Sequence, residues 1–173
     1  MKKEKMNRNI YDPENPKTKK QLKDLRTPWK LWLYFFKHLP SVLFFGVRLK
    51  SLTPYKAEVT VPFKWRTQNP FRSIYAGAQF AAAELSNGLI AGHLIYGRGK
   101  MAMLITKVEI EYVKKATSLT TFTCEEGQKL MDGIQKAIDL GEPQEVTVLT
   151  TGTQKDGEVV SRMWFTWSFK MRD

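Results

Sequence analysis

The most constraining feature of this sequence is a run of small residues at 76–95, AGAQFAAAELSNGLIAGHLI, which has the length and pattern of a long helix. Alanine and glycine fill nine of its positions, so no face carries the polar side chains of a surface helix. A helix that is apolar on most sides belongs in a core. Small side chains also let a sheet pack closely around it, so the sequence predicts a buried central helix wrapped by a sheet.

Glu84 is the one acidic residue in this helix. Ionised groups are costly to bury, so Glu84 is expected to be ion-paired, to lie at the mouth of a pocket, or to take part in chemistry. Burial among alanines would raise the pKa of its carboxyl group, which suits a base that works near neutral pH. Glu84 is therefore a candidate catalytic residue, and a paired structural carboxylate is the alternative.

Two segments precede the predicted sheet. Residues 1–27 are polar and basic and contain two Pro breakers, which predicts a flexible or loosely docked leader. Residues 28–45 are rich in aromatic residues and predict two short helices, broken near Pro40, that pack on the protein's own core. The alternative for 28–45 is an amphipathic anchor on a membrane surface, with Trp29 and Trp32 at the interface. The run is too short and too interrupted to span a bilayer, which takes about 20 apolar residues.

The remaining pattern predicts a single α+β domain over residues 28–173. Alternating apolar residues indicate antiparallel strands, and one amphipathic stripe indicates a second helix. In chain order we expect strands at 45–52 and 57–63, the central helix at 76–95, strands at 102–113 and 119–124, the second helix at 127–140, and strands at 145–152 and 159–171.

This order resembles the hotdog fold, in which an antiparallel sheet wraps one long central helix. Acyl-CoA thioesterases of the phenylacetate-degradation and 4-hydroxybenzoyl-CoA types carry an Asn or Gln, then His-Gly-Gly at the helix start, then an acid. Here Asn69 precedes Tyr75-Ala76-Gly77 by the family's spacing, and Glu84 stands at the acid's position. The sequence most resembles an uncharacterised bacterial branch of the fold. Compared with a minimal hotdog domain it has an extra N-terminal helix and the inserted helix at 127–140.

Two residues depart from the family pattern. Tyr75 stands where His is usual, and Ala76 stands where the family has the glycine whose N–H helps to hold the substrate's carbonyl oxygen. A residue in the first helical turn has ordinary helical dihedral angles and a free N–H at the positive end of the helix dipole. The resemblance therefore still implies an oxyanion site at Ala76 and Gly77. The altered pair also leaves open a non-catalytic protein that binds acyl-CoA.

The chemistry that these residues imply is hydrolysis of an acyl thioester, so the chain is expected to be an enzyme. A thioester carbonyl needs donors aimed at its oxygen and a base or nucleophile at its carbon. The helix N-terminus supplies the donors. Glu84 either attacks the carbon directly or takes a proton from water, and Asn69 orients that water or the carboxylate. Both routes for Glu84 stay open on the sequence alone.

Helix geometry adds an expectation about assembly. Residues 76 and 84 are eight apart, which is about 12 Å along a helix axis. A glutamate side chain cannot close that gap to reach the same carbonyl group. The donors and the acid of one site should therefore come from two subunits, which predicts a homodimer, or a dimer of dimers.

Other polar and aromatic residues near the motif are candidates for contact with the substrate. Residues expected to line the acyl site are Ser73, Tyr75, Gln79, Phe80, Gly88, Thr106 and Lys107. Basic residues expected to bind the phosphates of coenzyme A are Arg72, Lys114 and Lys115. Caps, core contacts or solvated positions are the alternative explanation for each of them. Coenzyme A enters only as part of the substrate, and no other cofactor is expected because phosphate-loop and dinucleotide-binding patterns are absent.

The single cysteine and the two histidines set further limits. One cysteine excludes an internal disulfide, and no Cys/His cluster has metal-ligand spacing, so we expect no metal and a cytoplasmic location. Cys124 lies in an alternating strand and is expected to be a packed thiol. His93 lies at the end of the central helix, where we expect a cationic side chain that complements the helix dipole.

The formal net charge of +11 favours an anionic partner. Residues 1–27 hold nine Lys/Arg against four Asp/Glu, so both the leader and the rest of the chain are basic. Acyl-CoA, or an acyl group on a carrier protein, is the expected partner. No nucleic-acid motif accompanies the charge, so no nucleic acid is expected. A basic surface that only keeps the protein in solution is the alternative explanation of the charge. A peripheral membrane or nucleic-acid-associated protein that uses residues 1–45 is a further alternative, although we do not expect membrane contact.

Overall fold

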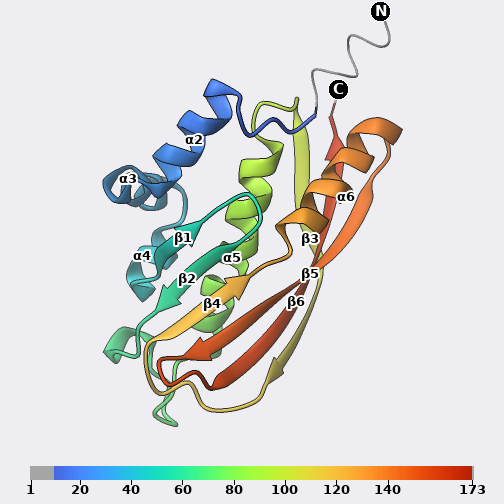
Figure 1. Cartoon of the computed structure of the whole chain (residues 1–173). Coiled ribbons are helices and arrows are strands. Elements are labelled where there is room, and N and C mark those ends of the chain that lie inside the picture. The colour runs from blue at the N-terminus through green and yellow to red at the C-terminus, as the bar shows by residue number, and fades with distance from the viewer. Residues whose placement is uncertain (1–9, 173) are drawn as a thin grey trace, which may run out of the picture.

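Six antiparallel strands form one sheet in the order β1-β2-β4-β5-β6-β3, and the long helix α5 packs against it (Figure 1). The computed structural model describes residues 10–172. The helices are α2 (Pro16–Arg26), α3 (Pro28–His38), α4 (Pro40–Phe45), α5 (Ala76–Ile95) and α6 (Gly127–Leu140), with a short 3-10 turn η1 (Trp65–Thr67). The strands are β1 (Arg48–Leu52), β2 (Ala57–Val61), β3 (Met101–Tyr112), β4 (Thr120–Cys124), β5 (Gln144–Gln154) and β6 (Val159–Met171). This arrangement confirms the predicted hotdog fold.

Helix α5 has the predicted bounds, and its small residues explain its place. Ala78, Ala82, Ala83 and Ala91 are completely buried. The helix contacts β2, β4 and β5 on the sheet and α6 beside it. Because alanine side chains are short, the strands of the sheet can approach the helix backbone closely.

One long edge of the sheet is open. Strand β3 pairs with β6 from Met101↔Met171 to Tyr112↔Ser161, and no other strand of residues 10–172 pairs with its outer side. Several apolar side chains of this edge region are exposed, namely Leu104, Ile110, Tyr112 and Val113. An exposed, long and apolar edge strand is a ready surface for another chain.

Residues 10–27 of the predicted leader are docked on the domain and are not flexible. Helix α2 covers most of this stretch, and it docks on the domain through Arg26, whose Nε donates to the Leu52 carbonyl at 2.7 Å. Tyr11 Oη lies 2.9 Å from Nε2 of His93, and Gln21 Oε1 is bonded to Nδ1 of the same ring. Residues 1–9 of the predicted leader lie outside the described residues.

Helices α3 and α4 confirm the two predicted helical pieces but only half of their predicted packing. Leu31, Phe35 and Val42 are buried in the core. Other large apolar side chains of these helices are exposed, namely Trp29, Trp32, Leu33, Tyr34, Phe36 and Phe44. The expectation that the aromatic stripe packs on the protein's own core is therefore wrong for these side chains. Helices α3 and α4 lie at the left of the molecule in Figure 1.

Candidate functional site

The carboxylate of Glu84 lies between its own helix and strand β6. A β-carbon built on Gly88, one turn further along α5, would lie 3.2 Å from Glu84 Oε1 and 3.7 Å from the Trp167 ring. The missing side chain of Gly88 therefore leaves the space in which the carboxylate and the indole ring meet. The register pairs Trp167 with Ile105 of β3, so Glu84 faces the part of the sheet next to the open edge.

Glu84 is largely buried and makes no hydrogen bond or ion pair with any of residues 10–172. Burial raises the pKa of its carboxyl group. A paired structural carboxylate was the alternative, but Glu84 has no such partner in the described chain. An unpaired, partly buried acid with a raised pKa is a candidate for a catalytic base or nucleophile.

A buried hydrogen-bond network holds the indole ring beside Glu84. Trp167 Nε1 donates to Asn87 Oδ1 at 2.8 Å, and Asn87 Nδ2 donates to Thr150 Oγ1 at 3.1 Å and to the Ala83 carbonyl at 3.0 Å. Ser86 Oγ lies 3.2 Å from the same threonine hydroxyl. Neither Asn87 nor Trp167 was predicted from the sequence. A polar Asn in the apolar helix three residues after Glu84 was the available signal.

The N-terminus of α5 carries free donors, as the motif implies. No side chain caps it, and the N–H groups of Ala76 and Gly77 have no acceptor among residues 10–172. The Tyr75 ring lies over Gly77, because a β-carbon built there would lie 2.5 Å from ring atom Cε1. Burial and the neighbouring Tyr75 raise the pKa of Tyr112, so the end of β3 also lies close to this helix end.

Asn69 shapes the loop that leads into α5. Its Oδ1 accepts from the backbone N–H groups of Phe71 at 3.0 Å and Ser73 at 3.1 Å, and its Nδ2 donates to Ser73 Oγ at 3.0 Å. The loop also holds Arg72 at a positive φ of 58°. In this chain, Asn69 and Ser73 are thus bonded to each other. The second N–H of the Asn69 amide is the group left to act on water or substrate.

Gln79 is turned into the protein interior. Its Nε2 donates to the Ile74 carbonyl at 3.0 Å, and Ser161 Oγ donates to its Oε1 at 3.4 Å. These bonds tie the start of α5 to β6. The predicted contact of Gln79 with substrate would require the bond to Ile74 to break. Phe80 also packs inward, with its ring centroid 5.5 Å from that of Phe165.

The remaining predicted binding residues lie on β3 and on the surface. Thr106 is the bulged residue of β3, and its Oγ1 donates to the Thr166 carbonyl at 3.3 Å. Lys107 is exposed and pairs with Glu109 at 2.5 Å. Arg72 and Lys115 are exposed, whereas Lys114 is ion-paired with Glu158. No contact gathers these basic residues into one cluster.

Within one chain, the two halves of the predicted site stay apart. Ala76 and Glu84 lie on the same straight element, eight residues or about 12 Å apart along its axis. The described chain therefore does not assemble a complete thioester site by itself.

His93 and Cys124 are both buried. Burial lowers the pKa of His93 to about 4, so its ring is neutral near pH 7, and the prediction of a cationic side chain at this helix end is wrong. Burial raises the pKa of the Cys124 thiol to about 11, which confirms a packed thiol. A neutral thiol of this kind is a poor nucleophile.

The arrangement of acidic, histidine and cysteine side chains and the lengths of the helices bear on other functions. Over residues 10–172, no three His, Cys, Asp or Glu side chains come together as a metal site. In the same part of the chain, no helix has the length and apolar character needed to cross a bilayer.

Solved structures with the same fold include proteins named as thioesterases. PA5026 from Pseudomonas aeruginosa, a protein of unknown function named a probable thioesterase, is 19% identical with a TM-score of 0.68, and the match covers 84% of this chain and 97% of that one. The thioesterase HI1161 from Haemophilus influenzae is 16% identical with a TM-score of 0.62, covering 83% of this chain and 90% of that one. At such low identity these likenesses show the fold alone. The resemblance to thioesterases of the phenylacetate-degradation or 4-hydroxybenzoyl-CoA type stays a prediction.

Sequence comparison gives the family but no function. Among curated proteins, none matches this sequence. The model of a domain of unknown function, DUF4442, matches residues 31–169, which is most of the chain. The protein therefore belongs to the DUF4442 family and has the hotdog fold.

Proposed function

We propose that this protein is a thioesterase that hydrolyses an acyl-CoA or acyl-carrier thioester, with Glu84 as its catalytic carboxylate. The observation that carries the proposal is the Glu84 carboxylate itself, which is largely buried, has no partner in the described chain and has a raised pKa. A buried acid without a partner does not stabilise the fold. Glu84 stands at the position where the resembling thioesterases have their acid. The thioesterase names of several proteins with the same fold support the same reaction class.

The active unit in this proposal is a homodimer formed through the open edge of β3. Glu84 lies beside Trp167, whose neighbour in the sheet is Ile105 of β3, so the carboxylate lies near this edge. Pairing of two β3 strands would cover their unpaired backbone groups and exposed apolar side chains. It would also bring the α5 N-terminus of one subunit towards Glu84 of the other, and so assemble two sites.

The proposed chemistry uses both subunits. The N–H groups of Ala76 and Gly77 from one subunit hold the thioester oxygen, where negative charge develops. Glu84 of the other subunit either attacks the carbonyl carbon to give an anhydride that water then cleaves, or takes a proton from the attacking water. The thiol of coenzyme A leaves in both routes. Asn69 orients the water, and Arg72, Lys114 and Lys115 are the candidate contacts for the coenzyme's phosphates.

The test is hydrolysis of a broad acyl-CoA panel, in which a thiol reagent detects released coenzyme A. Glu84→Gln should abolish release while the protein stays folded, because the amide neither attacks nor takes a proton. Glu142→Gln is the matched control, since Glu142 is exposed and unpaired among residues 10–172, and it should keep wild-type turnover. Unchanged turnover in Glu84→Gln would remove Glu84 from the reaction.

A second candidate function is an acyl-CoA-binding protein without catalysis. It is favoured by the Tyr75 ring, which lies over Gly77 at the place where the carbonyl oxygen would bind. Such a protein would be stabilised by acyl-CoA in a thermal shift and would release no thiol from any member of the panel.

A further inference from the structure

An aromatic face covers the outer side of α3 and α4. Six large apolar side chains make up this face, each 47–64% exposed: Trp29, Trp32, Leu33, Tyr34, Phe36 and Phe44. The rings of Trp32 and Phe36 stack on it, with centroids 5.4 Å apart and planes 12° from parallel. Single exposed apolar residues need no explanation, but six large ones on two helices that contact each other mark an interaction surface.

The surroundings of this face are positively charged. The sequence has no Asp or Glu between Asp24 and Glu58, whereas Lys and Arg recur throughout that interval. Lys37, Arg48 and Arg66 form no ion pair with any acidic side chain of residues 10–172. Their charges are therefore available to an anionic partner.

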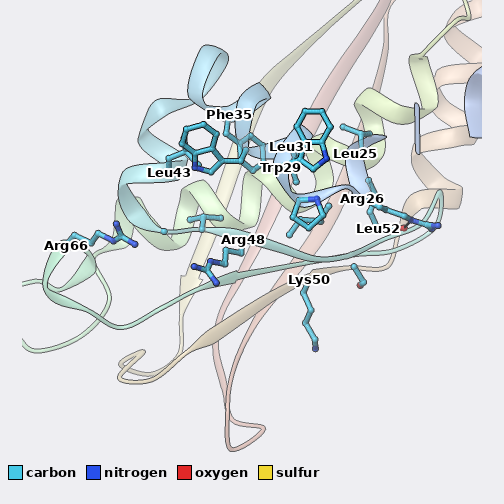
Figure 2. Close-up of a pocket in the computed structure, with 16 residues that line it drawn as sticks. Leu25, Arg26, Trp29, Leu31, Phe35, Leu43, Arg48, Lys50, Leu52 and Arg66 are labelled. Atoms are coloured by element: carbon cyan, nitrogen blue, oxygen red, sulfur yellow. Dashed lines mark hydrogen bonds between the residues drawn. The ribbon is translucent and has the colours of Figure 1, made fainter. Parts of the chain in front are cut away.

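A groove of about 710 Å³ adjoins the face, between α3 and the edge strand β1, and Trp29 and Trp32 belong to both. Apolar side chains and four cations line it, and no acidic residue of the described part of the chain does. Figure 2 shows Arg48 and Arg66 towards one end of the groove and Leu25 and Trp29 towards the other. Gly46 has a φ of +68°, and the Arg66 guanidinium occupies the space that a side chain at this position would need.

The charge decides between the surfaces that could cover the aromatic face. A second copy of the chain would set this cationic, acid-free surface against itself, and like charges across an interface are unfavourable. A bilayer with anionic lipids satisfies both features, because Trp and Phe side chains enter the head-group region while Lys and Arg contact lipid phosphates.

We propose that the aromatic face docks this protein on the surface of an anionic lipid bilayer. Trp29, Trp32 and Phe36 lie in the head-group region, and Arg48 and Arg66 bind lipid phosphates at the groove. The protein lies on the membrane and does not cross it. This surface is separate from Glu84, so the inference stands or falls independently of the proposed hydrolysis.

The test is co-sedimentation of the full chain with vesicles of phosphatidylcholine alone and of an equal mixture with phosphatidylglycerol. The protein should pellet with the mixed vesicles and should be released by high salt, which screens the cations. Trp32→Ser combined with Phe36→Ser should weaken binding by about tenfold or more, because two large apolar side chains no longer leave water. Arg48→Gln and Arg66→Gln should each weaken it by about fivefold.

A matched pair of leucines separates this surface from general stickiness. Leu33 on α3 is 50% exposed and Leu140 on α6 is 55% exposed. Leu33→Ser should weaken vesicle binding and Leu140→Ser should not, with unchanged melting temperatures in both. The proposal is overturned if the chain does not pellet with anionic vesicles, or if the two leucine variants bind equally. Self-association that Leu33→Ser abolishes, without vesicle binding, would overturn it in favour of a second copy.

Discussion

At the scale of single residues, the Glu84 carboxylate lies in space that is open because Gly88 has no side chain. A β-carbon on Gly88 would lie 3.2 Å from Glu84 Oε1, which is closer than most real contacts of this kind. Gly88→Ala should therefore push the carboxylate from its place. The same substitution removes a glycine from a helix interior, which favours the folded state by up to about 1 kcal/mol.

Gly88→Ala is expected to lower kcat for acyl-CoA hydrolysis without lowering stability. The matched control is Gly92→Ala, one turn further along α5, where a β-carbon would meet nothing within 4 Å. It should bring a similar gain in stability and leave kcat unchanged. Equal kcat values in the two variants would show that the carboxylate does not depend on the space at Gly88.

The raised pKa of Glu84 also predicts how stability depends on pH. A carboxyl group whose folded pKa lies above its unfolded pKa stabilises the fold fully below the unfolded value, about 4.3, and this stabilisation is lost as pH rises through the folded pKa. At neutral pH, the Glu84 side chain therefore destabilises the folded state of the wild-type protein. Glu84→Gln stays neutral, so it should have a higher free energy of unfolding than wild type at pH 7.

Urea denaturation at pH 7 and near pH 4 measures this difference. The advantage of Glu84→Gln should disappear near pH 4, whereas Glu142→Gln should differ little from wild type at either pH. A Glu84→Gln protein less stable than wild type at pH 7 would mean that the carboxylate has a stabilising partner.

The candidate site was proposed from residue identity, but the side chains that surround Glu84 could not be predicted in this way. Glu84 stood out as a lone acid in an apolar helix, and Ala76 and Gly77 as the start of that helix. Trp167 lies 83 positions further along the chain, and it reaches Glu84 through the pairing of β5, β6 and β3. Such tertiary neighbours depend on sheet register, which a single sequence fixes only locally.

At the scale of elements, helix α2 was misread for an identifiable reason. Asn15-Pro16 was interpreted as a breaker, yet Asn15 Oδ1 accepts from the Lys17 N–H at 2.9 Å and Pro16 is the first helical residue. Asn followed by Pro is equally a helix start, because Asn caps and Pro fits the first turn.

The aromatic helices α3 and α4 were also ambiguous, since apolar residues on both faces of a helix do not show which face is buried. The strands and α5 were predictable because their periods were clear.

The contact between α2 and α5 should make stability sensitive to acid. Burial lowers the pKa of His93 to about 4, and the neutral ring bonds to Tyr11 and Gln21. A histidine with a depressed folded pKa contributes stability above its unfolded pKa of about 6.5, and this stability is lost as pH falls towards 4. The loss should amount to about 3 kcal/mol over that range.

Urea denaturation from pH 7 to pH 4 tests this contact. His93→Gln should flatten the pH dependence between pH 6.5 and 4, because glutamine does not titrate there. His38→Gln is the control, since His38 is exposed and should leave the slope unchanged. An unchanged slope in His93→Gln would mean that another group governs acid sensitivity.

At the scale of the whole molecule, the proposed reaction requires two subunits that share each site. Glu84 lies beside the open edge of β3, and the free N–H groups of the same helix lie about 12 Å away along its axis. The sequence could predict this division because helix rise is fixed. It could not show the edge, since strand order within the sheet is set by long-range pairing.

Subunit complementation tests this central claim most directly. Glu84→Gln removes the acid, and Ala76→Pro removes one N–H donor at the first helical position, where proline is well tolerated. Each variant alone should be nearly inactive. When equal amounts are unfolded and refolded together, each mixed dimer should contain one intact site, which restores about a quarter of wild-type hydrolysis at random pairing. No recovery in a mixture shown to contain mixed dimers would contradict the account, because the donors and Glu84 would then have to act within one chain.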